Sequence, residues 1–168
     1  MKGLLKILFL GASGIIIVYG IRQVMLLYKS AYKVVKTKIN NLSITGIDII
    51  LYLQLTNKSD ISAQVVNQHY DIFLNDAKIS VVDLKEEVHI NSNGNSILPI
   101  AINFNPSKAA NIAWRNLGSL LNDKSKINIT ILGYLSLKVG PVKTNNYPIN
   151  ITYTLQDLIN FKNKPKNE

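Results

Sequence analysis

The feature that most constrains this chain is a run of alternating apolar residues, LSITGIDIILYLQLTN, from Leu42 to Asn57. Its opposite face carries Asp48, Tyr52 and Gln54, and the polar stretch NKSD ends the run. Side chains of a strand alternate between its two faces, so the run predicts a half-buried β-strand followed by a turn. The predicted buried face consists of Ile47, Ile49, Leu51, Leu53 and Leu55.

Shorter runs with the same period follow along the chain. The segment YDIFLNDAKISVV predicts a hairpin, because Asn75-Asp76 tolerates the positive φ of a tight turn. The segment VHINSNGNSILPIAINF predicts a second hairpin around a turn of Ser, Asn and Gly. Its second half places four apolar residues on one face: Leu98, Ile100, Ile102 and Phe104.

The clearest alternation lies in INITILGYLSLKV, where Gly133 stands in the apolar row and indicates a bend or a bulge. The row itself comprises Ile127, Ile129, Ile131, Leu135, Leu137 and Val139. The predicted outward residues are Asn128, Thr130, Tyr134, Ser136 and Lys138. A last strand, INITYTL, points Ile149, Ile151, Tyr153 and Leu155 inward. About seven or eight such strands predict an all-β domain, an antiparallel β-sandwich.

One short helix is expected to interrupt the strands, in NPSKAANIAWRNLGSLLND. A Pro-Ser start precedes it, and one of its faces carries Ala110, Trp114, Leu117 and Leu121. We interpret Trp114 as a cap over an open end of the sandwich, with ligand stacking as the alternative role.

An apolar run, ILFLGASGIIIVYGI, lies near the N-terminus between Lys6 and Arg22. As a helix it would be about 22 Å long, and snorkelling of the two flanking side chains would extend the apolar span to Leu4–Tyr28. Tyr19, Tyr28 and Tyr32 could then lie at the membrane interface. We therefore predict an N-terminal hydrophobic or transmembrane helix over residues 1–33. The residues expected to contact lipid or a partner are Ile7, Leu8, Phe9, Leu10, Ile15, Ile16, Ile17, Val18, Ile21, Val24, Met25 and Tyr28.

Two alternatives to a membrane anchor remain open. A signal peptide shares the basic start and the apolar middle, although no small-x-small cleavage site follows Ile21. A helix that packs in a protein assembly is indicated by a stripe at helical spacing, formed by Ile21, Val24, Met25, Tyr28, Tyr32 and Val35. A count of the basic flanking residues places the C-terminal body in the cytoplasm. A short basic N-terminus before a lone anchor nevertheless commonly stays inside while the rest is exported, and we favour export of the C-terminal body.

The formal net charge of +9 comes from the two ends of the chain. Seven basic residues and no acidic residue precede Ile39, whereas nine of each lie between Ile39 and Asn160. A nucleic-acid-binding domain carries its positive surface on the folded body, so this distribution argues against nucleic acid as a partner. Basic residues beside an apolar run instead suit anionic lipid headgroups.

No residue pattern for catalysis or cofactor binding is found. The chain has no cysteine, and neither His69 nor His89 has a metal-ligand partner at i+3 or i+4. We interpret the two histidines as strand-face residues, and Asp83, Glu86 and Glu87 as a solvated turn rather than a carboxylate pair. Phosphate-binding loops and serine-nucleophile motifs are also absent. The prediction is a protein that is not an enzyme and has no cofactor and no metal.

The stretch LSITGIDIILYLQLTNKSDISAQVVNQHYDIFLNDAKIS resembles the late embryogenesis abundant type 2 (WHy) domain. In that family a long alternating strand ends in an Asn-Pro-like turn, here Asn57-Lys58-Ser59, and a hairpin follows with an Asn-Gly-like turn, here Asn75-Asp76. ILPIAINF, the Trp114 helix and INITILGYLSLKVGPVKTNNYPINITYTL match its later segments. The resemblance implies a fibronectin- or immunoglobulin-like sandwich over residues 34–158, often behind a single N-terminal anchor, with no established catalytic residue or cofactor.

Together these observations predict a hydrophobic helix over 1–33, the sandwich over 34–158 and a basic tail over 159–168. The expected function is a membrane-anchored binding or scaffolding module, and the expected partners are lipid or a protein at the N-terminal helix. Self-association is also possible. The alternatives are a structural subunit of a virion or secretion machine, and a carrier of lipid or another small apolar ligand. The abundance of Ile, Asn and Lys suggests a bacterial or bacteriophage source.

Overall fold

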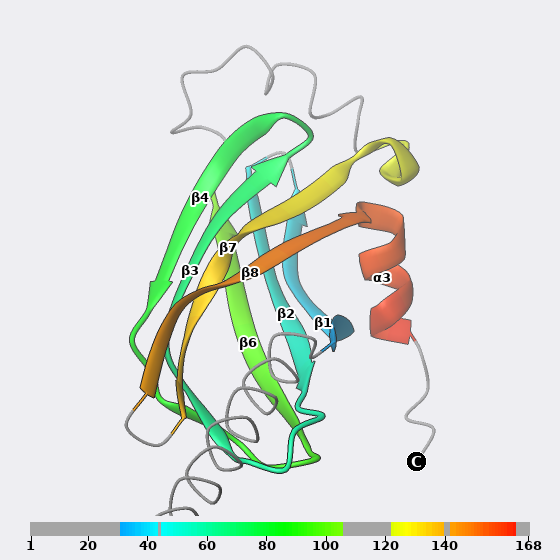
Figure 1. The fold of residues 1–168 in the computed structure, drawn as a ribbon. Helices are drawn as coiled ribbons and strands as arrows, with labels where there is room; N and C mark the ends of the chain where they lie inside the picture. Colours follow the sequence, from blue (N-terminus) through cyan, green and yellow to red (C-terminus); the bar gives the residue numbers. More distant parts are fainter. Residues whose placement is uncertain (1–30, 44, 106–121, 140–141, 164–168) are drawn as a thin grey trace, which may run out of the picture.

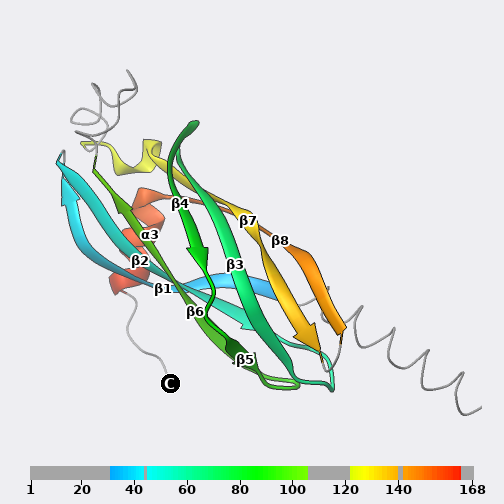
Figure 2. The same ribbon diagram turned by 90° about the vertical axis from the view of Figure 1, so that its left-hand side faces the viewer.

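Two antiparallel β-sheets face each other in the computed structural model, which describes residues 31–43, 45–105, 122–139 and 142–163 (Figures 1 and 2). Sheet A has the order β1-β2-β6, formed by Ala31–Ser43, Gly46–Thr56 and Asn95–Phe104. Sheet B has the order β4-β3-β7-β8, formed by Ala77–Leu84, Ala63–Leu74, Asn128–Val139 and Val142–Thr154. The short β5, Val88–Ile90, pairs with β3 beyond the end of β4. The predicted antiparallel sandwich is confirmed.

The core lies between the sheets and is built from the predicted alternating rows. Burial alternates at each residue along β2, and the predicted inner row from Ile47 to Leu55 is buried throughout. In β6 the predicted row from Leu98 to Phe104 is buried in the same way. Burial of each large aliphatic side chain contributes about 1.5–3 kcal/mol. These rows therefore supply the main force that holds the two sheets together.

Strand β7 follows its predicted pattern up to a β-bulge. Ile127, Ile129, Ile131, Leu135 and Leu137 are buried as predicted, and Val139 is half-buried. Ser136 was predicted to point outward, but it is buried. The pairing of β7 with both neighbours shifts register around this residue, and a bulge places adjacent residues on the same side of a strand.

Of the two predicted hairpins, one is confirmed and the other is wrong. Strands β3 and β4 form a hairpin in which Asn75 has a φ of 50°, the positive value that the turn requires. Strands β5 and β6 are not partners, because β5 pairs with β3 in sheet B and β6 pairs with β2 in sheet A. The Ser-Asn-Gly turn therefore carries the chain from one sheet to the other, with Asn93 at a φ of 48°.

A C-terminal helix, α3 (Leu155–Asn163), was not predicted. Leu155 is buried as expected, but it starts the helix instead of ending the strand. A capping box accounts for the change of direction: Thr154 Oγ1 accepts a hydrogen bond from the Asp157 N–H, and the Asp157 carboxylate accepts one from the Thr154 N–H. Thr37 of β1 donates a hydrogen bond to the carbonyl of Leu158, which fixes α3 beside β1 (Figure 1).

The start of β1 corrects part of the predicted helical stripe. Tyr32 and Val35 lie in this strand, so they are not members of an N-terminal helix. The Tyr32 hydroxyl hydrogen-bonds to the backbone N–H and C=O of Asn150 at 3.0 and 3.3 Å, which joins the edge of sheet A to the edge of sheet B. The other predicted residues of the hydrophobic helix, and the Trp114 helix, lie outside the described residues. Within the described part of the chain, no helix is long and apolar enough to span a membrane.

Candidate functional site

One end of the sandwich, which we call the basal end, gathers the start of β1, the β2–β3 connection (57–62) and the β5–β6 turn (91–94). It lies at the bottom of Figure 1. The two connections are joined by backbone hydrogen bonds from the Asn57 N–H to the carbonyl of Gly94 (2.8 Å) and from the Asn93 N–H to the carbonyl of Ser59 (2.9 Å). The Asn93 side chain also donates to the Asp60 carboxylate at 3.0 Å. The loops of the basal end therefore form one rigid unit.

The side chain of Asn57 organises these loops from inside the protein. Asn57 is 2% exposed, and its amide nitrogen donates to the carbonyls of Ile61 (2.9 Å) and Asn91 (3.0 Å). Its amide oxygen accepts hydrogen bonds from the N–H and the hydroxyl of Ser59, which is fully buried. Buried polar groups without partners are costly, so a fully bonded asparagine stabilises one loop conformation. We conclude that Asn57 has a structural role.

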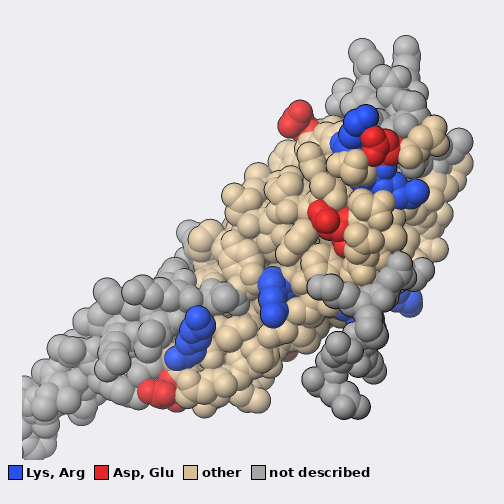
Figure 3. Space-filling model, turned by 90° about the vertical axis from the view of Figure 1, so that its right-hand side faces the viewer, with Lys and Arg blue, Asp and Glu red and all other residues tan. Residues whose placement is uncertain are grey.

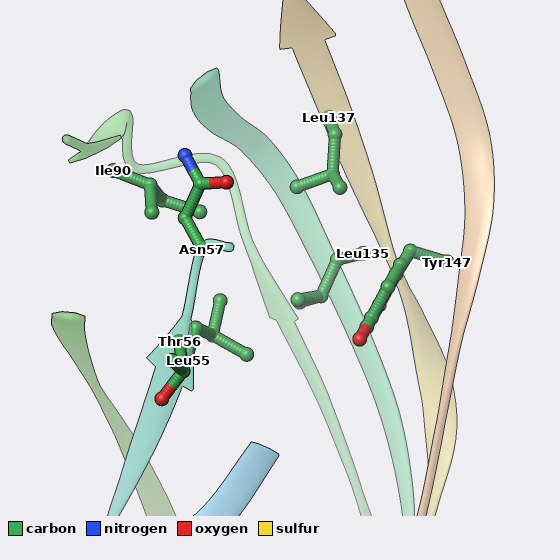
Figure 4. Close-up of a pocket in the computed structure, with 7 residues that line it drawn as sticks. All are labelled: Leu55, Thr56, Asn57, Ile90, Leu135, Leu137 and Tyr147. Carbon is green, nitrogen blue, oxygen red and sulfur yellow. The ribbon is translucent and has the colours of Figure 1, made fainter. Parts of the chain in front are cut away.

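A small cavity lies beside these loops, between the two sheets (Figure 4). Leu55, Asn57 and Ile90 line one side of it, and Leu135, Leu137 and Tyr147 line the other. Inside the cavity, the centre of a water-sized sphere can occupy about 10 Å³. This is about the volume that one water molecule needs. Pockets for small molecules measure roughly 300–1,000 Å³. The cavity therefore offers no room for an acyl chain or for a cofactor.

The ring of Tyr147, on one wall of the cavity, is buried and contacts Tyr32 edge-on, with ring centres 6.3 Å apart. Burial raises the pKa of Tyr147 to about 12, and the nearby Tyr32 adds to the rise. Burial also raises the pKa of the core residue Tyr70, whose hydroxyl donates to the Gln68 side chain at 2.9 Å. Both tyrosines are therefore neutral at ordinary pH.

A second cluster of polar groups occupies the outer face of sheet B. His69 Nδ1 lies 2.6 Å from an oxygen of Asp83, and Nε2 lies 3.7 Å from Asp71, which also pairs with Lys78 at 2.6 Å. The imidazole stacks on the ring of Tyr134, with ring centres 5.1 Å apart. Register explains the cluster, because Asp83 and Tyr134 lie opposite His69 on the two neighbouring strands.

This cluster is open to solvent, and that limits its chemistry. The Asp83 side chain is 63% exposed, and exposed ion pairs contribute about 0–1 kcal/mol. The histidine is a strand-face residue, as predicted, but it has a partner that its sequence neighbours did not reveal. Asp83 lies in β4 and not in the predicted solvated turn, and it pairs with His69 across the hairpin. Glu86 and Glu87 are exposed in the connection that follows, as predicted. Among the described residues, no group of three or more His, Cys, Asp or Glu side chains could hold a metal ion.

The residues that form the basal end differ from those that the sequence predicted as functional. The predicted membrane or partner residues from Ile7 to Tyr28, and Trp114, lie outside the described residues. Asn57 and Tyr147 were not predicted to be important. The polar turn NKSD was a signal for Asn57, because an Asx-turn residue at the end of a strand is well placed to bond neighbouring carbonyls. No sequence feature indicated a role for Tyr147, which precedes the predicted strand INITYTL and lies within β8 in the structure.

No protein-family model matches the sequence, and no curated protein does either. Solved structures do match, at low sequence identity. A protein from Archaeoglobus fulgidus is 15% identical, with a TM-score of 0.51 over 74% of this chain and 97% of that one. A protein described as a candidate late embryogenesis abundant protein is 16% identical, with a TM-score of 0.43 over 77% of this chain and 74% of that one. A third, from Arabidopsis thaliana, is 14% identical, with a TM-score of 0.44 over 73% and 78%.

These likenesses concern the fold. The Archaeoglobus protein supports the sandwich over nearly its own full length. The structural neighbours thus include a late embryogenesis abundant-like protein.

Proposed function

We propose that this protein is a non-enzymatic, membrane-anchored β-sandwich that acts as a binding or scaffolding module, related to the late embryogenesis abundant type 2 proteins of bacteria or bacteriophages. The observation that carries the proposal is the position of the first strand. β1 begins at Ala31, only three residues after Tyr28, where the predicted apolar span ends. A rigid sheet so close behind a hydrophobic segment suits a tethered domain.

The outer face of sheet B is the surface that we propose for partner binding. Val81 and Leu132 are 48% and 38% exposed, and both lie opposite Asp71 on neighbouring strands. They flank the cluster of His69, Asp83 and Lys78. Exposed apolar side chains around a few polar groups suit a protein partner better than a small molecule.

Nucleic acid is a poor fit to the charges of the body. Figure 3 shows the side that carries α3, where basic and acidic side chains are interspersed on a mostly uncharged surface. Recognition of a phosphate backbone needs a basic patch or stripe. The described atoms of this face show no such stripe, which supports lipid or protein as the partner there.

Fractionation of expressing cells tests the anchor. We expect the full chain to stay with the membrane pellet after a carbonate wash, because an apolar span remains in the bilayer when ionic contacts are removed. Release of the chain into the supernatant would count against the proposal.

The alternative of a structural subunit in a large assembly is supported by the same exposed residues, Val81 and Leu132. Sizing of the chain in detergent-free buffer separates the two. A stable soluble oligomer favours the assembly, and a requirement for detergent favours the anchor. A role as a lipid carrier has less support, because the cavity at the basal end is too small; native mass spectrometry would detect a bound lipid.

A further inference from the structure

Four lysines surround the basal end of the sandwich. Lys33 is the third residue of β1, and Lys58 lies in the β2–β3 connection. Lys138 and Lys143 lie at the end of β7 and the start of β8, each within two residues of the strand terminus. All four side chains are exposed. The fold therefore gathers lysines from four separate segments at the end of the domain where the chain leaves the predicted hydrophobic segment.

The pairing of the strands adds an unfavourable contact to this arrangement. Lys138 and Lys143 lie directly opposite each other in the β7–β8 ladder. Side chains at such positions start about 4.5–5.5 Å apart, and like charges there destabilise a sheet. An anionic group bound between the two lysines would relieve this repulsion.

The described residues do not supply that partner. None of the four lysines forms an ion pair with a described carboxylate, whereas Lys78 and Lys126, away from the basal end, pair with Asp71 and Asp123. Asp60 is the acidic residue of the basal loops, and it accepts a hydrogen bond from Asn93. Glu86 and Glu87 precede Val88, which pairs with Val65 of β3, so they lie on the edge of sheet B and β3 separates them from Lys138 of β7.

We propose that the basal end contacts anionic lipid headgroups through Lys33, Lys58, Lys138 and Lys143. This inference rests on the proposed membrane anchor. The three residues from Tyr28 to Ala31 span at most about 11 Å when fully extended, which is close to the Debye length of about 10 Å at 0.1 M salt. Lys33, two residues after Ala31, thus lies within reach of the field of an anionic surface, and the other three lysines lie at the same end of the sandwich, where each can contribute to attraction.

Site-directed labelling of the full chain in lipid vesicles tests the contact. The chain has no cysteine, so Ser92→Cys in the β5–β6 turn carries a single fluorophore at the basal end, and Asp76→Cys in the β3–β4 turn carries one at the opposite end. Energy transfer to an acceptor on the lipid headgroups reports how close each label is to the membrane. The vesicles contain phosphatidylcholine alone, or phosphatidylcholine with phosphatidylserine.

We expect phosphatidylserine to increase energy transfer from the label at position 92 and to leave the label at 76 unchanged. The triple variant Lys58→Gln, Lys138→Gln, Lys143→Gln should lower the ratio of docked to undocked protein roughly 100-fold, since each lysine near an anionic surface contributes about 1 kcal/mol. The matched variant Lys38→Gln, Lys85→Gln, Lys124→Gln removes the same charge elsewhere and should retain the response. Energy transfer that ignores phosphatidylserine, or an equal loss in both variants, would overturn the inference.

Failure of the anchor gives a different result. In one outcome, carbonate releases the chain, but the label at position 92 still approaches phosphatidylserine vesicles reversibly. This outcome would refute the anchor and support the lysine contact. A chain that resists carbonate but shows no dependence on phosphatidylserine would retain the anchor and refute the contact.

Discussion

Replacement of Gly133 by alanine should disrupt the centre of sheet B. Gly133 lies in β7 opposite Tyr70 of β3, where the two strands approach closely. A Cβ atom at this position would lie 1.9 Å from the carbonyl oxygen of His69 and 2.9 Å from the Cα of Tyr70. Ordinary contacts of this kind are 3.4–4 Å long, so the backbone of β3 or β7 must move by more than 1 Å.

The expected cost follows from what must move. An added methyl group in a packed core costs about 1–3 kcal/mol when side chains can adjust. At Gly133 the obstacle is the backbone of an inner strand, whose own pairing with β4 resists displacement. We therefore expect Gly133→Ala to lower the free energy of unfolding by at least about 3 kcal/mol.

Urea unfolding of the full chain, followed by the β-sheet circular dichroism signal, measures this change. With a denaturant slope of about 2 kcal/mol/M, a loss of 3 kcal/mol lowers the midpoint by roughly 1.5 M. Gly46→Ala is the matched control. A Cβ there lies 3.1 Å from the movable amide of Asn41, so the change in midpoint should be small. Equal stability of the Gly133→Ala and wild-type proteins would refute the close approach of β3 and β7.

Three other substitutions test separate parts of the structure. Asn57→Ala removes the hydrogen bonds that the buried side chain makes to the carbonyls of Ile61 and Asn91 and to the Ser59 N–H, so it should cost about 2–4 kcal/mol in urea unfolding. Exposed Lys58→Ala should cost less than about 0.5 kcal/mol. Thr37→Val removes the hydrogen bond to the Leu158 carbonyl and should speed hydrogen exchange in α3. Thr37→Ser keeps the hydroxyl and should leave the exchange unchanged. Equal exchange in the wild-type protein and both variants would refute a role of this hydrogen bond in holding α3. Burial raises the pKa of Tyr70 and Tyr147 in the folded state, so the contribution of these two phenols to stability should be constant below pH 10, where the unfolded phenols begin to ionise. Between pH 10 and 12 stability should fall by up to about 1.4 kcal/mol per pH unit for each group. Tyr147→Phe should make that fall less steep in alkaline unfolding, and an unchanged slope would contradict the burial of the phenol.

The alternation of apolar residues predicted much of this fold because a strand's two faces follow from local sequence alone. The rows of β2, β6 and β7 needed no knowledge of their partners. The α3 helix also had a local signal, the capping box Thr154–Asp157 with Leu155 and Leu158 at helical spacing, but the preceding alternation ran into it. Strand partners were harder to predict. The segment around Asn93 contains a good turn, and no local feature of the sequence indicates that the strands on either side of it, β5 and β6, belong to different sheets.

The polar contacts of the surface depend on register, and a single bulge changes them. From the Asn75-Asp76 turn, Leu74 pairs with Ala77 and Phe73 with Lys78, so regular pairing would place Val82 opposite His69. The bulge between Ile72 and Phe73 shifts the ladder by one residue and places Asp83 there instead. The turn was predictable from sequence and the bulge was not, which is why the ion pair was missed.

The charge of the body illustrates the same limit. Counted along the sequence, acidic and basic residues balance between Ile39 and Asn160, and this balance argued against a basic surface. Folding brings Lys58, Lys138 and Lys143 to one end from positions up to 85 residues apart in the chain, together with Lys33 from the preceding segment. Anions respond to charges within a Debye length in space, not along the chain. A neutral domain can therefore present a basic end, and here that end lies where the predicted membrane segment joins the first strand.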